Sequence, residues 1–444
     1  MLRAWVCLLI AWAAAFAPLS AAAPASVQVR EAIGLIAATQ RLKQATPTGR
    51  GVRLGHVEGN PGSYLPHLAH PAFRDIRSHV RSGPSAVNAH ADGTARLFYG
   101  KDGLAPGATE VDHFTSGGWL GPEFLRVGSS LPPASDPIQV FSHSWISLKP
   151  LIIDDEALRR IDFIVDERDV VVVVGVNNGA QTAVPPLLAS GYNAIAVGHW
   201  SGKSSGGYTV TGVKGRCKPD LVGPLDFTSH ATPVVAAFAA RLLEAAQRSP
   251  HLNAARAEVV KACLMAGATK PREWSREAGK PLDARLGAGR VHLDRSLQIL
   301  EAGAQPPGAV KGEAGWAFAP LFRTGRAAYT FTLAQPAEFS AVLTWHRRID
   351  GQIVADEVTG LPRWSGVPSF SDFNLALRRR EDGLDLTAAQ SLSAIDNVEH
   401  VYLDVLPAGH YTLEVWREDG LPEFWEYALA WTAGPVRPPS TPKP

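Results

Sequence analysis

Cysteine is scarce in this chain, and neither sign of charge dominates it. The 444 residues include 3 cysteines, and 43 Lys and Arg stand against 42 Asp and Glu, for a formal net charge of +1. With no long basic run, neither nucleic acid nor an anionic membrane surface is an implied partner. Beyond the N-terminal region, no apolar stretch is long enough to span a bilayer. A protein or small-molecule substrate is therefore expected.

The composition is typical of a globular protein. Hydrophobic residues make up 45% and charged residues 19% of the chain, and its length suits two or three domains. Arg3 is followed by an apolar stretch and then by small residues ending at Ala23, which predicts a secretory signal peptide over residues 1–23. The mature protein is expected to be secreted or periplasmic, with no membrane contact after cleavage.

The two cysteines that remain after cleavage are Cys217 and Cys263. An oxidising compartment would permit them to pair, and two buried thiols are an equal alternative. Cys7 belongs to the segment that is removed.

The mature chain has two main regions with different sequence patterns. Residues 24–46 have helical apolar spacing and end at a turn signal. Over residues 47–305, strand-like runs such as RLGHV, QVFSHSW and VVVVVGV alternate with helix-like ones such as DEALRRIDFIVDE. This alternation predicts an α/β domain with a parallel sheet and helices on both faces.

Residues 306–436 predict a second, all-β domain. Short alternating runs, namely AAYTFTL, EFSAVLTW, FNLALRRR, HVYLDVL and HYTLEVW, are separated by Gly, Pro, Asp and Asn. This pattern favours an antiparallel β-sandwich. Residues 437–444 are rich in proline and predict a disordered tail.

A serine directly ahead of an apolar helix is the strongest functional signal. Thr228-Ser229-His230-Ala231-Thr232-Pro233 precedes VVAAFAARLL. Free N–H groups of a helix's first turn stabilise an oxyanion forming beside such a serine, and Pro233 is expected within that turn, where proline is tolerated. The string resembles the GTSxATP nucleophile motif of the subtilisin-like serine proteases (subtilases). The resemblance implies an acid, a histidine and Ser229 in that order along the chain.

The acid is expected at the end of the first core strand. GVRLGHVEGNPG resembles the family's strand ending in DxG, with Glu58 where aspartate is usual. Glutamate is the acid in some Ser-His-Glu hydrolases. Its extra methylene requires a shift of the strand or of the histidine; the alternative interpretation is a surface glutamate beside a turn.

The base is expected at His90. HADGTARLFYG resembles the family's HGTHVAG helix start, and GLAPGATEV after it resembles GVAPGA. An alternative alignment places Asp92 at the histidine position, which would mean an inactive protein. His90 is preferred because that alternative discards the histidine.

The oxyanion donor is expected at Asn177. VVVVVGVNNGA resembles the family's AAGNxG, in which the asparagine amide donates to the developing charge; Asn178 is the alternative donor. Further matches are NAIAVGHW, KPDLVGP and LGAGRVHLDRSLQIL. Ser144 and Trp145 occupy the position of the substrate-binding strand, although the usual SLGG reads SWIS here.

Metal chemistry is not expected. His143 and His199 lie next to tryptophans and are interpreted as packed histidines rather than metal ligands. No cofactor is required for the predicted reaction. Ser371-Asp372 and Asp396-Asn397 could in principle coordinate calcium, but solvated turns are the simpler interpretation. The sequence indicates no oligomeric state.

The sequence thus predicts a secreted serine endopeptidase that acts on proteins or peptides. The competing hypothesis is an inactive binding or scaffolding protein with the same fold, suggested by Glu58, by the incomplete histidine motif and by Phe227 in place of glycine before Thr228. An esterase with the same residues is a third hypothesis. The Glu-Asp-Ser scheme of the sedolisins fits poorly, because the predicted helix supplies His90 and the oxyanion position holds Asn177.

Overall fold

The computed structural model describes residues 25–147, 153–308, 310–357, 359–421 and 423–436. The predicted signal peptide and the predicted tail lie outside these residues. The α-helices are α1 (Val27–Ala32), α2 (Leu35–Leu42), α3 (Ala89–Phe98), α4 (Ser116–Leu120), α5 (Asp154–Arg168), α6 (Thr228–Gln247), α7 (Ala257–Ala266) and α8 (Leu293–Glu301). No helix among the described residues is both long enough and apolar enough to cross a membrane.

A seven-stranded sheet, parallel throughout, forms the centre of the first domain. Its strand order is β11-β8-β7-β6-β1-β5-β3. The strands are β1 (Arg53–Glu58), β3 (Arg77–Val80), β5 (Glu110–Thr115), β6 (Val140–His143), β7 (Val171–Gly175), β8 (Ile195–His199) and β11 (Leu221–Gly223). Two short pairs lie outside it: β2 (Ser63–Leu65) with β4 (Ala86–Val87), and β9 (Gly207–Tyr208) with β10 (Cys217–Lys218).

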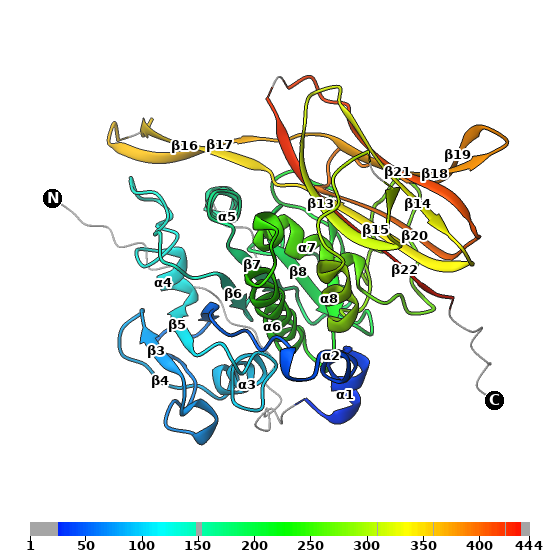
Figure 1. Cartoon of the computed structure of the whole chain (residues 1–444). Coiled ribbons are helices and arrows are strands. Elements are labelled where there is room, and N and C mark those ends of the chain that lie inside the picture. Colours follow the sequence, from blue (N-terminus) through cyan, green and yellow to red (C-terminus); the bar gives the residue numbers. More distant parts are fainter. Residues whose placement is uncertain (1–24, 148–152, 309, 358, 422, 437–444) are drawn as a thin grey trace.

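Helices cover both faces of this sheet. In Figure 1, α4 and α5 lie on one side of it, and α3 and α6 lie on the other. The valines of β7 are all buried, as a strand covered on both faces requires. The predicted α/β architecture is confirmed.

The N-terminal segment differs from the single helical pattern that the sequence suggested. It forms α1 and α2, which are separated at Gly34. Gly34 adopts a left-handed conformation with φ of 73°, and a Cβ there would lie 2.3 Å from Cε1 of His292. The close contact with α8 therefore requires glycine at the position where the helix breaks.

The second domain is a β-sandwich. One sheet has the order β12-β14-β21-β18-β19 and the other β13-β22-β15-β20; all pairs are antiparallel except β12 with β14. The strands are β12 (Val310–Lys311), β13 (Ala314–Leu321), β14 (Arg326–Leu333), β15 (Ala337–Thr344), β18 (Phe373–Glu381), β19 (Leu384–Ser391), β20 (Val398–Leu406), β21 (Gly409–Arg417) and β22 (Trp425–Pro435). Both sheets contribute to one apolar core, which confirms the predicted sandwich.

A long hairpin extends from the sandwich across α5. It consists of β16 (Arg348–Ala355) and β17 (Pro362–Ser369) and projects from the body of the domain in Figure 1. The Trp364 ring packs edge-on against Phe163 of α5, and the Arg160 guanidinium lies over it, 4.4 Å from the ring centroid. The sequence patterns did not predict this hairpin.

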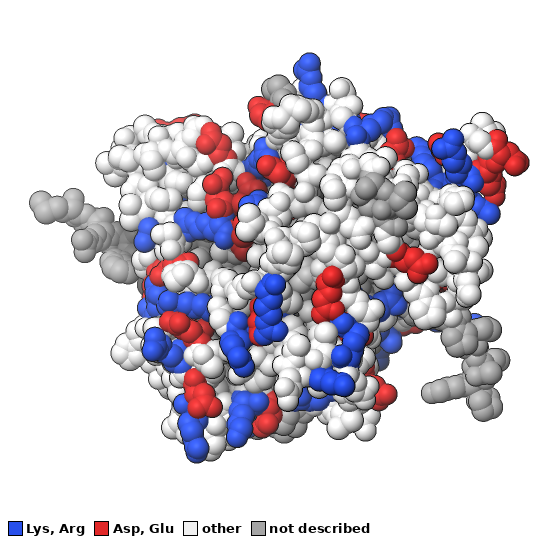
Figure 2. Space-filling view, viewed as in Figure 1, with Lys and Arg blue, Asp and Glu red and all other residues white. Residues whose placement is uncertain are grey.

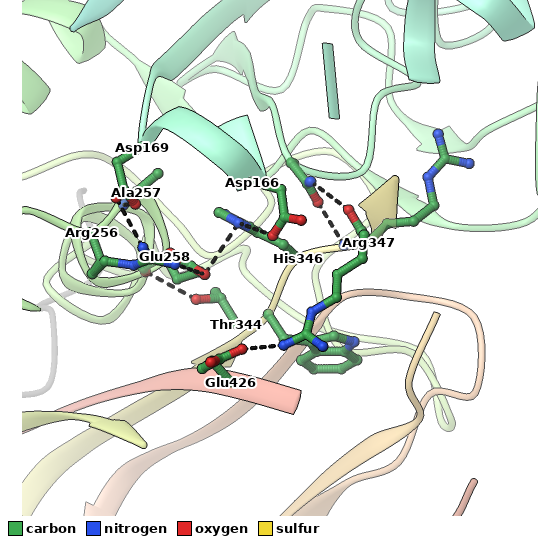
Figure 3. Close-up of polar contacts among 12 residues, drawn as sticks. Asp166, Asp169, Arg256, Ala257, Glu258, Thr344, His346, Arg347 and Glu426 are labelled. Atoms are coloured by element: carbon green, nitrogen blue, oxygen red, sulfur yellow. Dashed lines mark hydrogen bonds and ion pairs between the residues drawn. The ribbon is translucent and has the colours of Figure 1, made fainter. Parts of the chain in front are cut away.

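The two domains share a buried seam. Trp316 of β13 joins the apolar core of the first domain, and its indole N–H donates to Leu300 O. His346, just after β15, lies between two carboxylates of the first domain (Figure 3): its Nδ1 is 3.1 Å from Glu258 Oε1 and 3.3 Å from Asp166 Oδ1. The sandwich is therefore anchored to α5, α7 and α8 by apolar and charged contacts together.

Cys217 and Cys263 are both buried and free, so the structure settles the open question of pairing in favour of two thiols. Burial raises the pKa of Cys217 to about 12, and it also raises the pKa of Cys263. Both side chains act as apolar core residues at neutral pH.

On the face drawn in Figure 2, basic and acidic side chains are interspersed and form no extended patch of one sign. The pattern on that face agrees with the balanced composition.

Candidate active site

The predicted residues come from neighbouring parallel strands. Glu58 ends β1, Ser144 directly follows β6 and Asn177 lies two residues after β7, and these three strands are adjacent in the sheet. Because the carboxyl ends of parallel strands lie along one edge, the three residues are brought to the same edge. Ligand sites of open α/β sheets lie along this edge.

His90 is placed by the start of α3. Asn88 caps this helix, and its Oδ1 accepts hydrogen bonds from the N–H groups of His90 (2.8 Å) and Ala91 (3.1 Å). The His90 imidazole then contacts Glu58, with 2.7 Å between Nδ1 and Oε2. The end of β1 and the start of α3 thus bring the Glu58 carboxylate and the His90 ring into direct contact.

Asp92, the alternative at the histidine position, has other partners. Its Oδ1 accepts from the N–H of His67 at 3.0 Å, and its Oδ2 accepts from Arg96 Nε at 2.7 Å. The Asp92 carboxylate is thus bound to His67 and Arg96. The residue that contacts Glu58 is His90 and not Asp92.

The charges of Glu58 and His90 support each other. Burial alone would raise the pKa of Glu58, but His90 and His56 hold it well below its usual range. Burial alone would lower the pKa of His90, but the charge of Glu58 and the hydrogen bond to it raise that pKa above its ordinary value. An ionised Glu58 favours a hydrogen on Nδ1 of His90, which leaves Nε2 free to accept a proton.

The second oxygen of Glu58 has partners that the sequence motifs did not reveal. Thr94 Oγ1 donates to Oε1 at 2.8 Å, and His56 Nε2 lies 3.1 Å from the same oxygen. His56 is in turn contacted by the hydroxyl of Tyr99, 3.2 Å from its Nδ1. The sequence spacing could have pointed to both residues. His56 lies two residues before Glu58 on the same face of a strand, and Thr94 lies four residues after His90 on the same face of a helix.

Ser229 is the second residue of α6 and is partly exposed. Among the described residues, neither its hydroxyl nor its N–H makes a hydrogen bond. In particular, the described residues include no hydrogen bond between Ser229 and His90; catalytic hydrogen bonds are often long without substrate. Ser229 N–H is therefore available to an oxyanion.

His90 lies close enough to the start of α6 to influence it electrostatically. Helix α3 packs against α6. Burial and the positive charge of His90 lower the pKa of His230, the neighbour of Ser229, to about 4. His90 and Ser229 therefore lie in one region of the sheet edge.

Pro233 does not lie in the first turn of α6, as the sequence suggested, because the helix already begins at Thr228. A proline at this sixth position has no N–H to donate to the carbonyl four residues earlier, which is that of Ser229. The hydroxyl of Ser144 donates to Ser229 O instead, at 2.9 Å. Ser144 thus binds the backbone of Ser229.

Asn177 and Asn178 play different parts. Asn178 Oδ1 accepts from both the N–H (2.8 Å) and the hydroxyl (2.9 Å) of Thr228 and so caps α6. The backbone of Asn177 is held by Ser205, at 3.0 Å through its N–H and 2.8 Å through its carbonyl. Its side-chain amide makes no hydrogen bond to a described residue, which leaves it available as a donor.

Trp145 and Phe227 shape the surroundings differently. The Trp145 side chain is buried, and its Nε1 donates to His143 Nδ1 at 3.2 Å. A substrate at this strand would therefore meet the backbone of Trp145 more than its ring. Phe227 is 37% exposed and packs edge-on against His230, so a bulky ring stands at the approach to Ser229.

The residues considered for metals and calcium mostly have protein partners. Asp396 Oδ1 accepts from the N–H of Cys217 at 2.7 Å, and Asn397 Nδ2 donates to Tyr192 O at 3.0 Å, so both help to fix the seam. His199 lies at the end of β8. The described residues contain one group spaced like metal ligands, formed by Asp166, Glu258 and His346 at the seam.

Comparisons with known proteins add little to this picture. No family model and no curated protein matches the chain. Among solved structures, it is similar to the patellamide maturation protease PatA, with 20% identity and a TM-score of 0.36 over 57% of this chain and 97% of PatA. It is also similar to MycP1 with its N-terminal propeptide removed, with 18% identity and a TM-score of 0.38 over 59% of this chain and 96% of MycP1. At these values neither likeness bears on the activity of this chain.

Proposed function

We propose that this chain is a serine endopeptidase of the subtilase type. One observation carries the proposal: Glu58 Oε2 and His90 Nδ1 are 2.7 Å apart on β1 and α3, and α3 packs against the helix whose first turn presents Ser229. An acid, an imidazole and a partly exposed serine in this arrangement are what acyl transfer by a triad requires.

In the proposed reaction, Nε2 of His90 removes the proton from Ser229 Oγ as this oxygen attacks the peptide carbonyl. The imidazolium that forms is stabilised by the Glu58 carboxylate, which accepts the hydrogen bond from Nδ1. His90 then gives its proton to the leaving amine, and a water molecule releases the acyl group by the same steps in reverse.

The negative charge on the carbonyl oxygen needs donors that are already in place. The Ser229 N–H and the Asn177 amide are the donors we propose, because both are without a hydrogen bond among the described residues. The helix dipole of α6 adds to their effect. Asn178 is less suited, because its amide oxygen already holds Thr228.

We propose further that residues 1–23 direct the protein out of the cytoplasm. This rests on the sequence of that segment alone: Arg3, an apolar stretch and small residues before the expected cleavage point. A protein or peptide in the extracytoplasmic space is then the proposed substrate.

A second candidate function is binding without hydrolysis. Two observations favour it: the exposed ring of Phe227 beside Ser229, and the lack of a hydrogen bond between Ser229 and His90 among the described residues. A groove that binds peptides without cleaving them would keep the fold and lose the chemistry.

The test is hydrolysis by the purified mature protein, with Ser229→Ala as control. A panel of unstructured proteins, peptides and esters is incubated with each protein, and products are identified by mass spectrometry. We expect peptide cleavage by the wild type alone. Cleavage of esters without peptides would make it an esterase, and peptide binding without cleavage of any substrate would establish the binding protein.

A further inference from the structure

The environment of Glu58 differs from a simple acid–histidine pair, because its two oxygens are bound from opposite sides. Oε2 faces His90, at 2.7 Å from Nδ1. Oε1 faces Thr94 Oγ1 at 2.8 Å and His56 Nε2 at 3.1 Å. All of these side chains except His90 are nearly fully buried, so water cannot substitute for a missing partner.

The hydrogen-bond roles form one consistent chain. The Tyr99 hydroxyl can donate to Nδ1 of His56, which leaves the hydrogen of that ring on Nε2. Nε2–H of His56 then points to Thr94 Oγ1 (2.9 Å) and Glu58 Oε1, and the Thr94 hydroxyl donates to Glu58. The Thr94 hydroxyl also lies 3.1 Å from the carbonyl oxygens of His90 and Ala91, but its contact with the Glu58 carboxylate is the shortest of the three. An anion is also the strongest of these acceptors, which favours donation to Glu58.

The positions of Thr94 and His56 follow from helix and strand periodicity. Thr94 lies four residues after His90 on α3, so both side chains project from the same face of the helix. His56 lies two residues before Glu58 on β1, so both project from the same face of the strand. The two elements therefore present their polar side chains to each other.

We propose that Thr94 and His56 are positioning residues that hold Glu58 against His90 and allow glutamate to act as the triad acid. A glutamate side chain has one more rotatable bond than aspartate, and without partners at Oε1 its carboxylate is free to turn away from His90. Tyr99 fixes the ring of His56 from behind. This inference rests on the proposed function for its catalytic meaning, although the positioning itself can be measured without any substrate.

The main test is an NMR titration of His90 in the full mature protein, labelled with 13C at histidine. The signal of His90 is assigned by its loss in His90→Gln. In Thr94→Val, which keeps the shape of the side chain, and in His56→Leu, we expect the pKa of His90 to fall from its raised value towards the ordinary one. Thr94→Ser and His56→Gln each retain a hydrogen-bond donor, so His90 should keep its raised pKa in these two variants.

The kinetic counterpart is the pH profile of kcat/KM on a peptide that the wild type cleaves. Thr94→Val should lower kcat by about 10- to 100-fold, which corresponds to the loss of a hydrogen bond to a charged group, with little change in KM. It should also move the acid limb of the profile to lower pH, because the pKa of His90 sets the position of that limb. Thr332→Val, an exposed change in the sandwich, is the matched control and should behave as wild type.

The outcomes separate this inference from the proposed function. If His90 titrates in Thr94→Val and His56→Leu as in the wild type, the positioning role is wrong, whatever the activity. If its pKa falls in both variants while the wild type cleaves no substrate, the positioning of Glu58 stands and the protease proposal fails. A drop in kcat without movement of the acid limb or of the His90 titration would mean general damage and overturn the inference.

Discussion

At the scale of single residues, the environment of Glu58 is the feature with the most direct consequences. The carboxylate keeps its contact with His90 at 2.7 Å, and its other oxygen is held by Thr94 at 2.8 Å. One carboxylate thus contacts partners on both sides. Replacing it by a shorter or a neutral group should reveal what each contact contributes.

Glu58→Gln is expected to lower kcat by about 10⁴-fold with little change in KM, because an amide no longer stabilises the imidazolium or fixes its tautomer. Glu58→Asp should also lose activity, since its carboxylate is withdrawn from both His90 and Thr94. The measurement is steady-state kinetics on a cleaved peptide. Glu110→Gln, at the opposite end of the sheet, is the control; wild-type kcat in Glu58→Gln would remove Glu58 from the mechanism.

The raised pKa of His90 gives a definite pH dependence. Glu58 stabilises the protonated imidazole, but the base must be neutral to accept the serine proton. The acid limb of kcat/KM should therefore lie above about pH 6.5, the ordinary histidine value. A pH–rate profile of the wild type measures it. A limb well below that value would contradict the ion pair with Glu58.

At the scale of elements, the start of α6 is held from two neighbouring strands. Asn178, after β7, caps Thr228, and Ser144, after β6, supplies the donor that Pro233 lacks. These contacts fix the turn that presents Ser229 relative to the edge of the sheet. Adjacent asparagines therefore have separable roles, one in stability and one in the proposed reaction.

Asn177→Ala should lower kcat by about 100- to 1,000-fold, as is typical for loss of an oxyanion donor, and leave stability nearly unchanged. Asn178→Ala should instead lower the free energy of unfolding by about 1 kcal/mol, because α6 loses its cap. Peptide kinetics and urea unfolding of both variants distinguish the roles. The reverse pattern would assign the donor to Asn178.

At the scale of the whole molecule, the sandwich is part of the folded unit rather than a loosely tethered module. Trp316 enters the core of the first domain, and His346 lies between Asp166 and Glu258. Burial alone would lower the pKa of His346, but the two carboxylates raise it above its ordinary value. The folded state therefore binds this proton more tightly than the unfolded state.

The contribution of His346 to the free energy of unfolding therefore depends on pH. For a group whose pKa is raised by folding, the stabilisation is complete below the unfolded pKa of about 6.5 and is lost as the pH rises through the folded value. The stability advantage of wild type over His346→Gln should thus be largest near pH 5.5 and shrink above pH 7. Urea unfolding of both proteins at several pH values measures it; an advantage that grows with pH would contradict the assignment.

The architecture could be predicted from the sequence because its signals are local. The five alternating runs of the sandwich are all strands, and the valine run is β7. The β16–β17 hairpin escaped prediction because its strands are mostly exposed and are stabilised by contacts with α5. The helix break at Gly34 could not be predicted, because the ring of His292 that requires glycine there is distant in sequence.

For the candidate site, motif spacing placed Glu58 and His90 correctly relative to each other, since both end or begin a regular element. It did not single out Thr94 and His56, because the motifs do not show which side chains of β1 and α3 contact each other across the two elements. It did not show that the ring of Trp145 is buried and donates to His143, so the predicted role of Trp145 in substrate binding would fall to its backbone. Contacts between side chains of different elements depend on how the elements pack, and the sequence motifs do not contain that information.

The most direct test of the central claim is labelling of the folded mature protein with a fluorophosphonate probe, which reacts only with an activated serine. Wild type, Ser229→Ala and His90→Gln are treated in parallel, and the site of modification is mapped by mass spectrometry. We predict modification of wild type at Ser229, none in Ser229→Ala and strongly reduced modification in His90→Gln. Folded wild type that stays unmodified would contradict the enzyme assignment and favour a protein that binds without hydrolysing.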